Sequence, residues 1–591
     1  MRLFLALFVL VFTSLAAAPA PAAIQYTISI DHPERHVFTV EMVIPDVKGS
    51  VTVQMPAWNA LYQIRDFSSH MRQVSAQADG KSSPIEKLDK QTWSATGDGT
   101  IKVRYETCWD EPGPFATQLN SEHAFLNLAM VLLYVPDRRS EKSTAIFLGV
   151  PPEWQFASAA LNSNAEFGRN RNFVMEAKDY DTLVDSPVEI GRFEEFDLPG
   201  VSPRIHVVIH GDNWKRDHVT DLLRRICRYE LGLMRDAPFE SYTFLFHIGK
   251  AAAGAGGGME HSFSTAINVA SDEFLAGVSA HEFFHLWNVK RIRPATLEPV
   301  DYTREQWTRA LWFAEGVTST YGSYTLLRSG IWTKDQFYLD LGNQISELES
   351  RPANRWQSAE ESSLNAWLEK YPLYNSADES VSYYTKGQML GVLLDIQLRE
   401  RTGNAVSLDD LLRHLNSEFA KKGRYYRDSL DIRLAAEKFS GTSFEEFFRR
   451  YVSGTDPLPW AETFALAGLD VRQQQMTRPA LGFSLNRDPS GEIRVTALSG
   501  NSPAASAGLK DGDVIAKWND GEIPRRLERW LRDRQPGEKL RLLVRREGKE
   551  LALEFPFDQA TVTVWIVSEQ HAPSEKAARI REGILQGMTR P

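Results

Sequence analysis

The sequence predicts a multidomain protein with β-rich domains at its two ends and a mixed α+β region between them. The first observation is length, because 591 residues exceed what one hydrophobic core can organise. The second is that apolar and polar residues alternate in the N-terminal third, as expected for half-buried strands. The third is a change after Arg304, where Leu, Phe and Trp recur at the three- and four-residue spacing of helices.

The composition is that of a folded, mildly acidic chain. Hydrophobic residues make up 42% and charged residues 24% of the sequence, which is typical of globular domains. The formal net charge of -10 argues against nucleic acid as the main partner.

Residues 1–23 have the pattern of a signal peptide. Arg2 is followed by the apolar run Leu3–Leu15 and then by the small residues of Ala16–Ala23. The apolar run is shorter than the roughly 20 residues that a spanning helix needs, and no comparable run follows. We therefore expect an exported protein, periplasmic or secreted, with no membrane span after cleavage.

The two cysteines, Cys108 and Cys227, fall in different expected domains. We therefore expect two unpaired thiols rather than a disulfide, although an exported protein would permit one. Neither has a C-x-x-C spacing, so neither is a good candidate for a zinc ligand.

Residues 24–200 are expected to form an N-terminal, antiparallel β-sandwich-like domain. The segments that alternate apolar and polar residues are Tyr26–Ile30, His36–Ile44, Ser50–Met55 and Ile101–Tyr105. No catalytic constellation is evident in this region. His123 and Asn127 are isolated polar residues to which the sequence assigns no role.

Residues 201–470 are expected to form an α+β domain whose later part is mostly helical. Its first elements are a strand at Arg204–His210, a helix within Trp214–Met234, a buried strand at Ser241–Ile248, a glycine- and alanine-rich loop at Gly249–Gly258 and a strand at Ser262–Ala270. Helical spacing then continues from Arg304 to about Gly468.

The C-terminal part is expected to hold one small domain. Residues 471–477 are polar and rich in Gln, and we interpret them as a linker. Residues 479–558 are expected to form a small β-rich domain. We expect residues 559–591 to form a short strand followed by a polar, helical tail.

The strongest chemical signal is the sequence H-E-x-x-H at His281, Glu282 and His285. Residues four apart lie on one face of a helix, so the two imidazoles can bind the same ion. Two histidines leave room for a third protein ligand and a water molecule, which is the pattern of a catalytic zinc site. Glu282 would then act as the general base on a zinc-activated water.

Three downstream glutamates are candidates for the third ligand. Glu298 lies before a proline in an expected turn, and Glu305 fits the first turn of a helix, where it would serve as a capping residue. Glu315 is a single carboxylate on an apolar helical face, where burial is costly unless a metal offsets the cost. We therefore choose Glu315.

Two further groups are candidates for handling the substrate. Tyr383 and Tyr384 open an expected helix, and either hydroxyl could donate to a developing oxyanion. Glu260 follows the glycine-rich loop, where glycines allow a ligand to approach the backbone closely. The next strand could pair with a peptide, and Glu260 could bind its free α-amine. That arrangement would make the protein an aminopeptidase.

Four motifs together resemble the glycyl aminopeptidase family of gluzincin metallopeptidases. They are Gly257–His261, His281–Pro294, Phe313–Thr318 and Val381–Gly387. Members of that family carry an N-terminal β domain, a thermolysin-like zinc domain and a C-terminal PDZ domain. The resemblance covers nearly the whole mature chain. The sequence departs from the family at Asn59–Leu61, where members usually have a Pro-Gly turn.

The resemblance implies a role for each matched residue and one Zn²⁺ per chain. Its implied zinc ligands are His281, His285 and Glu315, with Glu282 as the base and Glu260, Gly257 and Gly258 as the substrate-binding residues. A related, larger aminopeptidase superfamily has a tyrosine before x-Lys-Gly that stabilises the tetrahedral intermediate, which selects Tyr384. In that superfamily the third ligand lies closer to the second histidine, at a position that Arg304 occupies here. The family prefers peptides whose free N-terminal residue is small, Gly or Ala.

The small C-terminal domain resembles a PDZ domain. Leu481, Gly482 and Phe483 match its carboxylate-binding loop, whose backbone N–H groups would hold a peptide C-terminus. Ser502–Leu509 and Asp511–Ile515 match the turn and strand that follow.

Other residues near the zinc motif receive weaker assignments. Asn288 could orient a zinc ligand from outside the ligand set. Lys290, Arg291 and Arg293 could bind a substrate carboxylate, but we favour ordinary ion pairs. Two rival functions stay open: an endopeptidase of the same fold, in which Glu260 binds no amine, and a catalytically silent PDZ adaptor.

Overall fold

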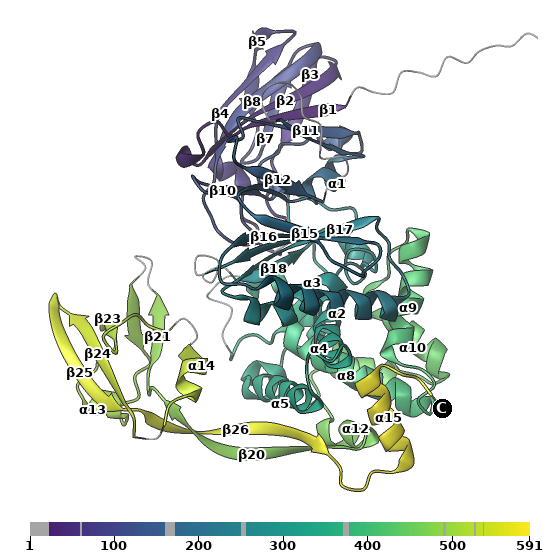
Figure 1. Cartoon of the computed structure of the whole chain (residues 1–591), viewed down its shortest axis with the longest axis vertical. Coiled ribbons are helices and arrows are strands. Elements are labelled where there is room, and N and C mark those ends of the chain that lie inside the picture. The colour runs from purple at the N-terminus through teal and green to yellow at the C-terminus, as the bar shows by residue number, and fades with distance from the viewer. Residues whose placement is uncertain are drawn as a thin grey trace, which may run out of the picture. The chain divides into compact units, whose positions relative to one another are not determined.

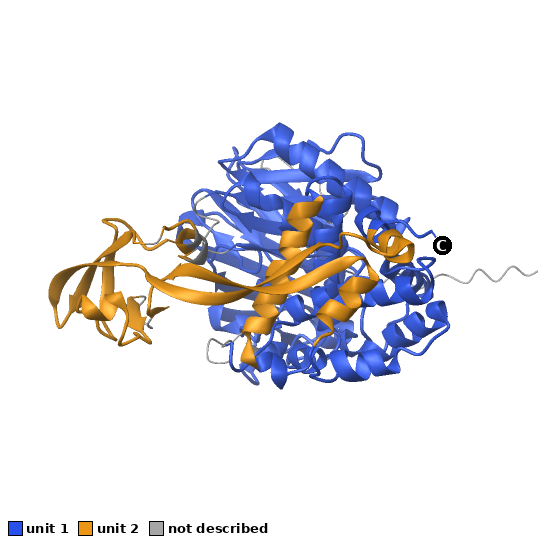
Figure 2. Cartoon of the chain, turned by 90° about the horizontal axis from the view of Figure 1, so that it is seen from below, with its two compact units in different colours: residues 1–333, 353–457, 582–591 blue, residues 334–352, 458–581 orange. Residues whose placement is uncertain are grey.

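The computed structural model describes residues 23–59, 62–159, 172–249, 256–369, 377–487, 492–524, 527–535 and 537–590. Residues 1–22 of the expected signal peptide, and Ala60 and Leu61 of the unusual turn, lie outside this part of the chain. The chain divides into two compact units, which Figure 2 colours separately. Unit 1 holds Met1–Thr333, Ala353–Pro457 and Glu582–Pro591, and unit 2 holds Lys334–Pro352 and Leu458–Arg581.

The N-terminal part of unit 1 is built on a seven-stranded sheet in the order β13-β11-β1-β2-β8-β4-β5. Its strands are β1 (Ile24–Ser29), β2 (Val37–Val47), β4 (Met71–Ala78), β5 (Lys81–Ser83), β8 (Gly99–Cys108), β11 (Ser143–Leu148) and β13 (Phe173–Ala177). The expected period of two is present, since alternate residues of β2 are buried from Phe38 to Ile44. The pairing differs from the prediction at one place, because β1 and β11 run parallel.

Two smaller sheets complete this β-rich region (Figure 1). One is β3-β7-β6, formed by β3 (Ser50–Gln54), β6 (Ile85–Lys87) and β7 (Thr92–Thr96). The other is β12-β14-β10-β9, formed by β9 (Gln118–Leu119), β10 (His123–Leu126), β12 (Gln155–Ser158) and β14 (Val188–Gly191). Helix α1 (Tyr180–Val184) precedes β14, and Asp179 caps it by accepting from the backbone N–H of Thr182.

The zinc-motif region begins with a five-stranded sheet in the order β15-β16-β17-β19-β18. Its strands are β15 (Glu194–Asp197), β16 (Arg204–Gly211), β17 (Ser241–Ile248), β18 (Gly257–Glu260) and β19 (Ser264–Val269). The three central strands are parallel and the two edge strands antiparallel. The end of the glycine-rich segment is thus itself the edge strand, and the strand expected after it lies one place further in.

Both faces of this sheet are covered, which explains the nearly continuous burial of β17. Helices α2 (Arg216–Met234) and α3 (Leu275–Phe284) lie on one side (Figure 1). On the other side Phe125 and Ala157 of the β10–β12 sheet pack against Val208, Leu245 and Ala266. The N-terminal β domain is therefore in direct contact with the sheet that carries the site.

Helices make up most of the remainder of unit 1, as the sequence predicted. They are the π-helical turn Trp312–Val317, α4 (Thr318–Arg328), α6 (Ala359–Leu364), α7 (Ala366–Glu369), α8 (Tyr383–Arg401), α9 (Leu408–Glu418), α10 (Asp428–Ser440) and α11 (Glu445–Phe447), followed by a second π-helical turn at Phe448–Val452. No helix in the described ranges combines the length and apolar character that crossing a bilayer requires.

Unit 2 contains a small β domain on a two-stranded ribbon. The ribbon pairs β20 (Leu469–Ala480) with β26 (Asp558–Glu569), and the five-stranded sheet has the order β21-β22-β23-β24-β25. Its elements are β21 (Ser484–Arg487), β22 (Ile493–Thr496), α13 (Pro503–Ser506), β23 (Val514–Trp518), α14 (Leu527–Arg532), β24 (Lys539–Arg546) and β25 (Lys549–Pro556). Helices α5 (Lys334–Ser350) and α12 (Trp460–Leu466) also belong to unit 2, and α15 (Glu575–Gln586) follows the ribbon.

The interpretation of residues 471–477 as a linker was wrong, because they lie in the middle of β20. This strand pairs with β26 over its whole length, and most of its central residues are exposed. Because these residues face solvent, the strand is polar, and its sequence is therefore similar to that of a linker.

Candidate active site

The two histidines of the zinc motif lie at the end of α3. The helix ends at Phe284, and His285 follows it in helical geometry. The Nε2 atoms of His281 and His285 are 3.0 Å apart, and their ring planes are nearly perpendicular, at 87°. Two rings at this angle can direct in-plane lone pairs at one point between them.

Glu315 joins the histidines from the π-helical turn. Its Oε2 lies 3.2 Å from Nε2 of His285 and 3.6 Å from Nε2 of His281. Ligand atoms bonded to one zinc ion at roughly 2.0–2.2 Å lie about 3.3–3.6 Å apart in tetrahedral geometry. The three donor atoms, 3.0–3.6 Å apart, are therefore slightly closer together than ligands of a bound zinc ion, and small shifts would accommodate one.

The electrostatics of this cluster also fit a cation. Burial lowers the pKa of His285, but the charge of Glu315 outweighs it and raises the pKa to about 10. Burial would raise the pKa of Glu315, yet the charge of His285 and hydrogen bonds from both histidines hold it well below its usual range. The Glu315 carboxylate therefore stays negatively charged between the two histidines, as a ligand of a divalent ion should.

Outer contacts hold the ligands in place. His285 Nδ1 donates to the backbone carbonyl of Asn288 at 2.7 Å, which leaves Nε2 free for a metal. The Asn288 side-chain amide donates to the carbonyl of Phe313 at 2.9 Å and contacts the Thr318 hydroxyl at 3.2 Å. Asn288 therefore connects the end of the zinc helix to the turn that carries Glu315, consistent with its expected orienting role.

The Glu315 turn is positioned by a close backbone contact with α8. A Cβ atom added to Gly316 would lie 2.4 Å from Cα of Gly387, so both positions require glycine. Of the two rejected glutamates, Glu298 forms an ion pair with Arg293 at 2.6 Å. The expected helix at Glu305 was wrong, because this residue lies in an irregular segment. Arg304, at the superfamily position, pairs with Asp301 at 2.7 Å.

Glu282 lies beside the ligands in a different environment. It is buried, and its Oε2 has no hydrogen-bond partner among the described residues. Burial raises its pKa to about 8, with smaller contributions from Glu260 and Glu315 that oppose the effect of His285. A carboxylate with raised proton affinity next to a metal site is suited to accept a proton.

Strand β18 brings Glu260 and the glycines to the same place. Carboxylate oxygens of Glu260 and Glu282 and a ring nitrogen of His285 all lie within 4.8 Å of one another. A Cβ atom on Gly258 would lie 2.4 Å from the Glu282 carboxylate, so only glycine fits there. Within the described residues β18 pairs with β19 alone, which leaves its outer edge available to a peptide.

The two tyrosines differ in their surroundings. Ser382 caps α8 by accepting from the N–H groups of Tyr384 and Thr385. Tyr383 packs in an apolar cluster with Trp58 and Trp367. The ring of Tyr384 lies 6.0 Å from that of His281, between ring centroids, and burial together with the charge of Glu315 keeps its pKa well above the usual range. Its hydroxyl therefore stays protonated and able to donate.

Two family models match the chain. The M61 glycyl aminopeptidase model matches residues 274–390, and the Peptidase M61 N-terminal domain model matches residues 25–192. The first range contains His281, Glu282, His285, Glu315 and Tyr384. The chain is a zinc metallopeptidase, and in these two ranges it is similar to the M61 glycyl aminopeptidase family. Glu260 and the small β domain of unit 2 lie outside both matched ranges.

Some solved structures are similar to this chain. A crystal structure of an aminopeptidase N family protein from Idiomarina loihiensis has 25% sequence identity and a TM-score of 0.78, over 95% of this chain and 100% of that one. An M1 zinc metallopeptidase from Deinococcus radiodurans, bound to a Tyr-Ser-Ala substrate, has 12% identity and a TM-score of 0.47, over 74% and 95%. No curated protein matches the chain.

The structure also places aromatic residues of the N-terminal domain beside the site, which the sequence interpretation missed. Phe115 lies 3.5 Å from where a Cβ of Gly257 would be. Tyr62 packs edge to face on Trp367, in the cluster that Tyr384 borders. Aromatic residues are usually core, and nothing local in the sequence indicated that Phe115 and Tyr62 lie beside the site.

The remaining predicted residues have structural partners. Lys290 pairs with Asp185 at 2.9 Å, and Arg291 donates to backbone carbonyls, including that of Ser262. Cys108 and Cys227 are both free, as expected.

In unit 2, Leu481 and Phe483 are buried in the small domain's core, and Gly482 has a φ of +75°, which glycine adopts readily.

Proposed function

We propose that this zinc metallopeptidase is an aminopeptidase that removes a small residue, Gly or Ala, from the free N-terminus of peptides. The observation that carries the proposal is the position of Glu260. Its carboxylate ends the edge strand β18 and lies with Glu282 and His285 inside one 4.8 Å cluster. A peptide paired along β18 would therefore place its α-amine at Glu260 and its first peptide bond near Glu282.

The protein residues divide the chemistry between them. His281, His285 and Glu315 would hold one zinc ion, which when bound lowers the pKa of a water molecule to roughly 7 and polarises a carbonyl group. Glu282 takes the proton of the attacking water and delivers it to the leaving amine. Tyr384 donates its hydroxyl proton in a hydrogen bond to the substrate oxygen on which negative charge develops.

The preference for small residues is supported by the space beside β18. Phe115 covers Gly257, and Gly258 has no room for a side chain because Glu282 lies against it. The first residue of the substrate lies near these groups, so a large side chain there would meet the Phe115 ring. Phe115→Ala should therefore improve turnover of Leu-amide relative to Gly-amide.

Comparing blocked and free substrates tests the aminopeptidase proposal. Glycyl and alanyl amides should be hydrolysed, and their N-acetylated forms should not. Glu260→Gln should raise KM for the free substrates by about 10-fold or more, because a charge-assisted contact to the amine is lost. Efficient hydrolysis of N-acetylated peptides by the wild type would instead support the endopeptidase.

We further propose that the small domain of unit 2 is a PDZ domain and that the protein is exported. The five-stranded sheet, the short helices α13 and α14 and the loop at Leu481–Phe483 support the first point. A labelled peptide with a free C-terminal carboxylate should bind, and its C-terminal amide should not; equal binding would exclude a carboxylate site. The sequence of residues 1–23 supports export, which N-terminal sequencing of the protein from its native cell would test.

A further inference from the structure

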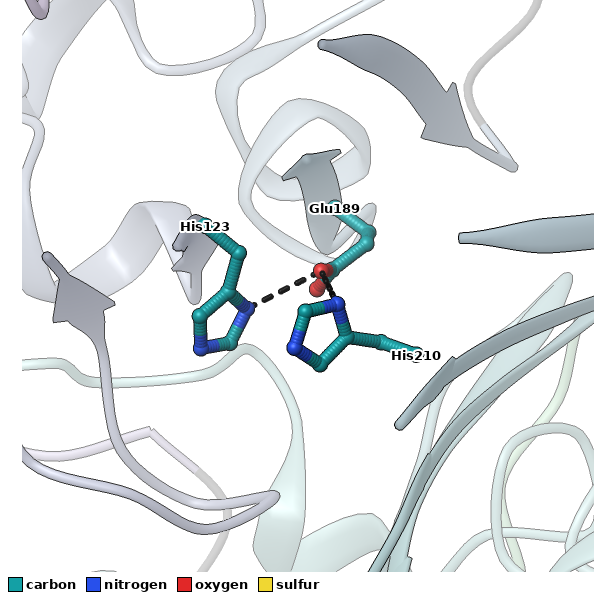
Figure 3. Close-up of side chains that lie close together, drawn as sticks. All are labelled: His123, Glu189 and His210. Atoms are coloured by element: carbon teal, nitrogen blue, oxygen red, sulfur yellow. Dashed lines mark hydrogen bonds and ion pairs between the residues drawn. The ribbon is translucent and has the colours of Figure 1, made fainter. Parts of the chain in front are cut away.

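A second cluster of histidines and a glutamate lies where the N-terminal β domain meets the catalytic sheet. His123 on β10 and Glu189 on β14 come from neighbouring strands of the N-terminal domain. His210 on β16 and His247 on β17 are paired residues of the catalytic sheet. Figure 3 shows His123 and His210 turned toward the Glu189 carboxylate.

The donor atoms of this cluster are close together. Glu189 Oε1 lies 3.0 Å from Nδ1 of His123 and 3.7 Å from Nδ1 of His210. These three donor atoms all lie within 4.8 Å of one another, as do those of the catalytic cluster. Glu189 Oε2 lies 2.8 Å from Nε2 of His247, so three imidazoles surround one carboxylate.

The cluster is buried and its geometry is supported from outside. The Glu189 side chain is 1% exposed and that of His123 is 8% exposed. The outer nitrogens of His123 and His247 donate to the side-chain oxygens of Gln118 and Asn268, both at 3.1 Å. Metal-binding histidines in proteins are commonly held by such outer contacts.

The backbone opposite His123 also makes room for this side chain. Gly191 is paired with His123 across the two strands, and a Cβ atom there would lie 2.7 Å from Cβ of His123. Any larger residue at Gly191 would push the imidazole away from Glu189.

These contacts leave the inner nitrogens of His123 and His247 facing the negatively charged Glu189 carboxylate. Because the outer nitrogens of His123 and His247 donate their protons to amide oxygens, the inner nitrogens of neutral rings would present lone pairs to the carboxylate. Either extra protons on the rings or a metal ion must satisfy that arrangement. A buried carboxylate surrounded by imidazoles is a donor set that zinc and similar divalent ions favour.

We propose that His123, Glu189 and His210 form a second site for a divalent transition metal, with His247 holding the other oxygen of Glu189. The ligands come from both domains, so the ion would fasten the N-terminal domain to the catalytic sheet. The rings of His123 and His210 are stacked, with centroids 4.2 Å apart and planes 11° apart. Ligation therefore requires His210 to rotate out of the stack and to give up its contact with the Arg192 carbonyl at 3.1 Å.

Metal stoichiometry tests this proposal independently of the peptidase activity. The protein is loaded with a small excess of zinc and desalted, and the bound metal is measured by mass spectrometry. The wild type should retain two ions per chain. A variant with both His281→Ala and His285→Ala should retain one, and adding Glu189→Gln should remove it. One ion in the wild type and none in the double variant would overturn the proposal.

Two controls separate metal loss from misfolding. His206→Ala removes a histidine from the same strand as His210, where its partners Glu195 and Asp197 are exposed, and should leave two ions bound. His210→Asn alters the most exposed ligand and should weaken the second ion with an unchanged circular dichroism spectrum. In the His281→Ala, His285→Ala background, a chelator should lower Tm. An unchanged Tm would mean that protons hold the cluster, and the proposal would fail.

Discussion

Two carboxylates of the catalytic cluster are buried to a similar degree but have opposite surroundings. Glu315 contacts both histidines, whose charge and hydrogen bonds hold its pKa low. Glu282 has one oxygen without a partner in the described part of the chain, and its pKa is raised to about 8. Neighbouring carboxylates whose pKa values are pushed apart commonly have different roles. Here the first suits a metal ligand and the second a proton acceptor.

The division of roles predicts the effect of Glu282→Gln. The variant keeps the shape and the zinc ligands but loses the base, so we expect kcat to fall about 10²–10⁴-fold with zinc content unchanged. Glu315→Gln should instead lose zinc, because it removes a ligand. Metal analysis and steady-state kinetics on both variants distinguish these outcomes. A Glu282→Gln enzyme with near-normal kcat would remove this residue from the proposed mechanism.

The contact between Gly258 and Glu282 gives a second prediction. Gly258→Ala adds a methyl group 2.4 Å from the base carboxylate, so we expect kcat to fall by about 100-fold while zinc stays bound. Gly277→Ala is the matched control, because it lies in the zinc helix and its added Cβ meets nothing within 4 Å. That variant should keep full activity. Equal kcat values for the two variants would contradict the proposed close contact.

Some residues of the site could be found from the sequence and others could not. The H-E-x-x-H spacing and the single carboxylate of an apolar helix are local patterns, and the structure brings His281, His285 and Glu315 together. Phe115 and the His123–Glu189–His210 cluster become neighbours of their partners only through tertiary packing. Isolated histidines on strands carry no periodic signal, so the sequence assigned them no role.

At the scale of elements, the site depends on how α8 packs against the Glu315 turn. Gly316 and Gly387 let the two backbones touch, and the same contact places Tyr384 near His281. A side chain at either glycine would separate the ligand from the zinc helix.

Gly316→Ala should therefore affect both stability and metal binding. We expect a loss of about 1–3 kcal/mol in the free energy of unfolding, because the methyl group overpacks a backbone contact. Zinc affinity should also fall. Urea unfolding and zinc titration measure these effects, with Gly232→Ala in α2, whose added Cβ meets nothing within 4 Å, as the control. If both variants matched the wild type, the close packing of α8 would have no energetic importance.

Prediction of elements succeeded where one face is buried and failed where none is. The helices that follow Ala310 have apolar faces, and the buried strands β16 and β17 have runs of apolar residues. The ribbon strand β20 buries little of its central part, so its polar residues resembled a linker. The glycine-rich segment ends in strand β18 because its residues pair with β19. A glycine-rich sequence has no apolar pattern from which this pairing could be predicted.

At the scale of the molecule, the N-terminal domain of unit 1 contacts the segments that carry the candidate site residues. Asp185, just after α1, accepts from Lys290 at 2.9 Å, from His261 at 3.1 Å and from the backbone N–H of Ser262 at 3.0 Å. Lys290 follows the zinc helix, and His261 follows Glu260. One carboxylate of the N-terminal domain thus connects the end of the zinc helix to the strand that carries the proposed amine-binding residue.

This arrangement predicts a pH-dependent loss of stability and a change in KM for Asp185→Asn. Burial would raise the pKa of Asp185, but the charge of Lys290 and the contacts of His261 and Ser262 hold it well below the usual range. A lowered pKa in the folded state stabilises the protein fully above the ordinary pKa of Asp, about 3.9. That stabilisation is lost as the pH falls below this value. Asp185→Asn should therefore cost about 2–4 kcal/mol at pH 7 and progressively less in acid.

Urea unfolding at pH 7 and below pH 4 measures this difference, and kinetics on glycyl amides provide a second readout. If Asp185 only stabilises the fold, KM will be unchanged when the variant is assayed well below its Tm. If it also positions Glu260, KM for free amides should rise while zinc content stays constant. Asp181→Asn provides a control, since Asp181 lies in α1, just before Asp185, and pairs with Arg139 instead. A stability difference that did not shrink in acid would show that the charge of Asp185 is not the source of the stabilisation.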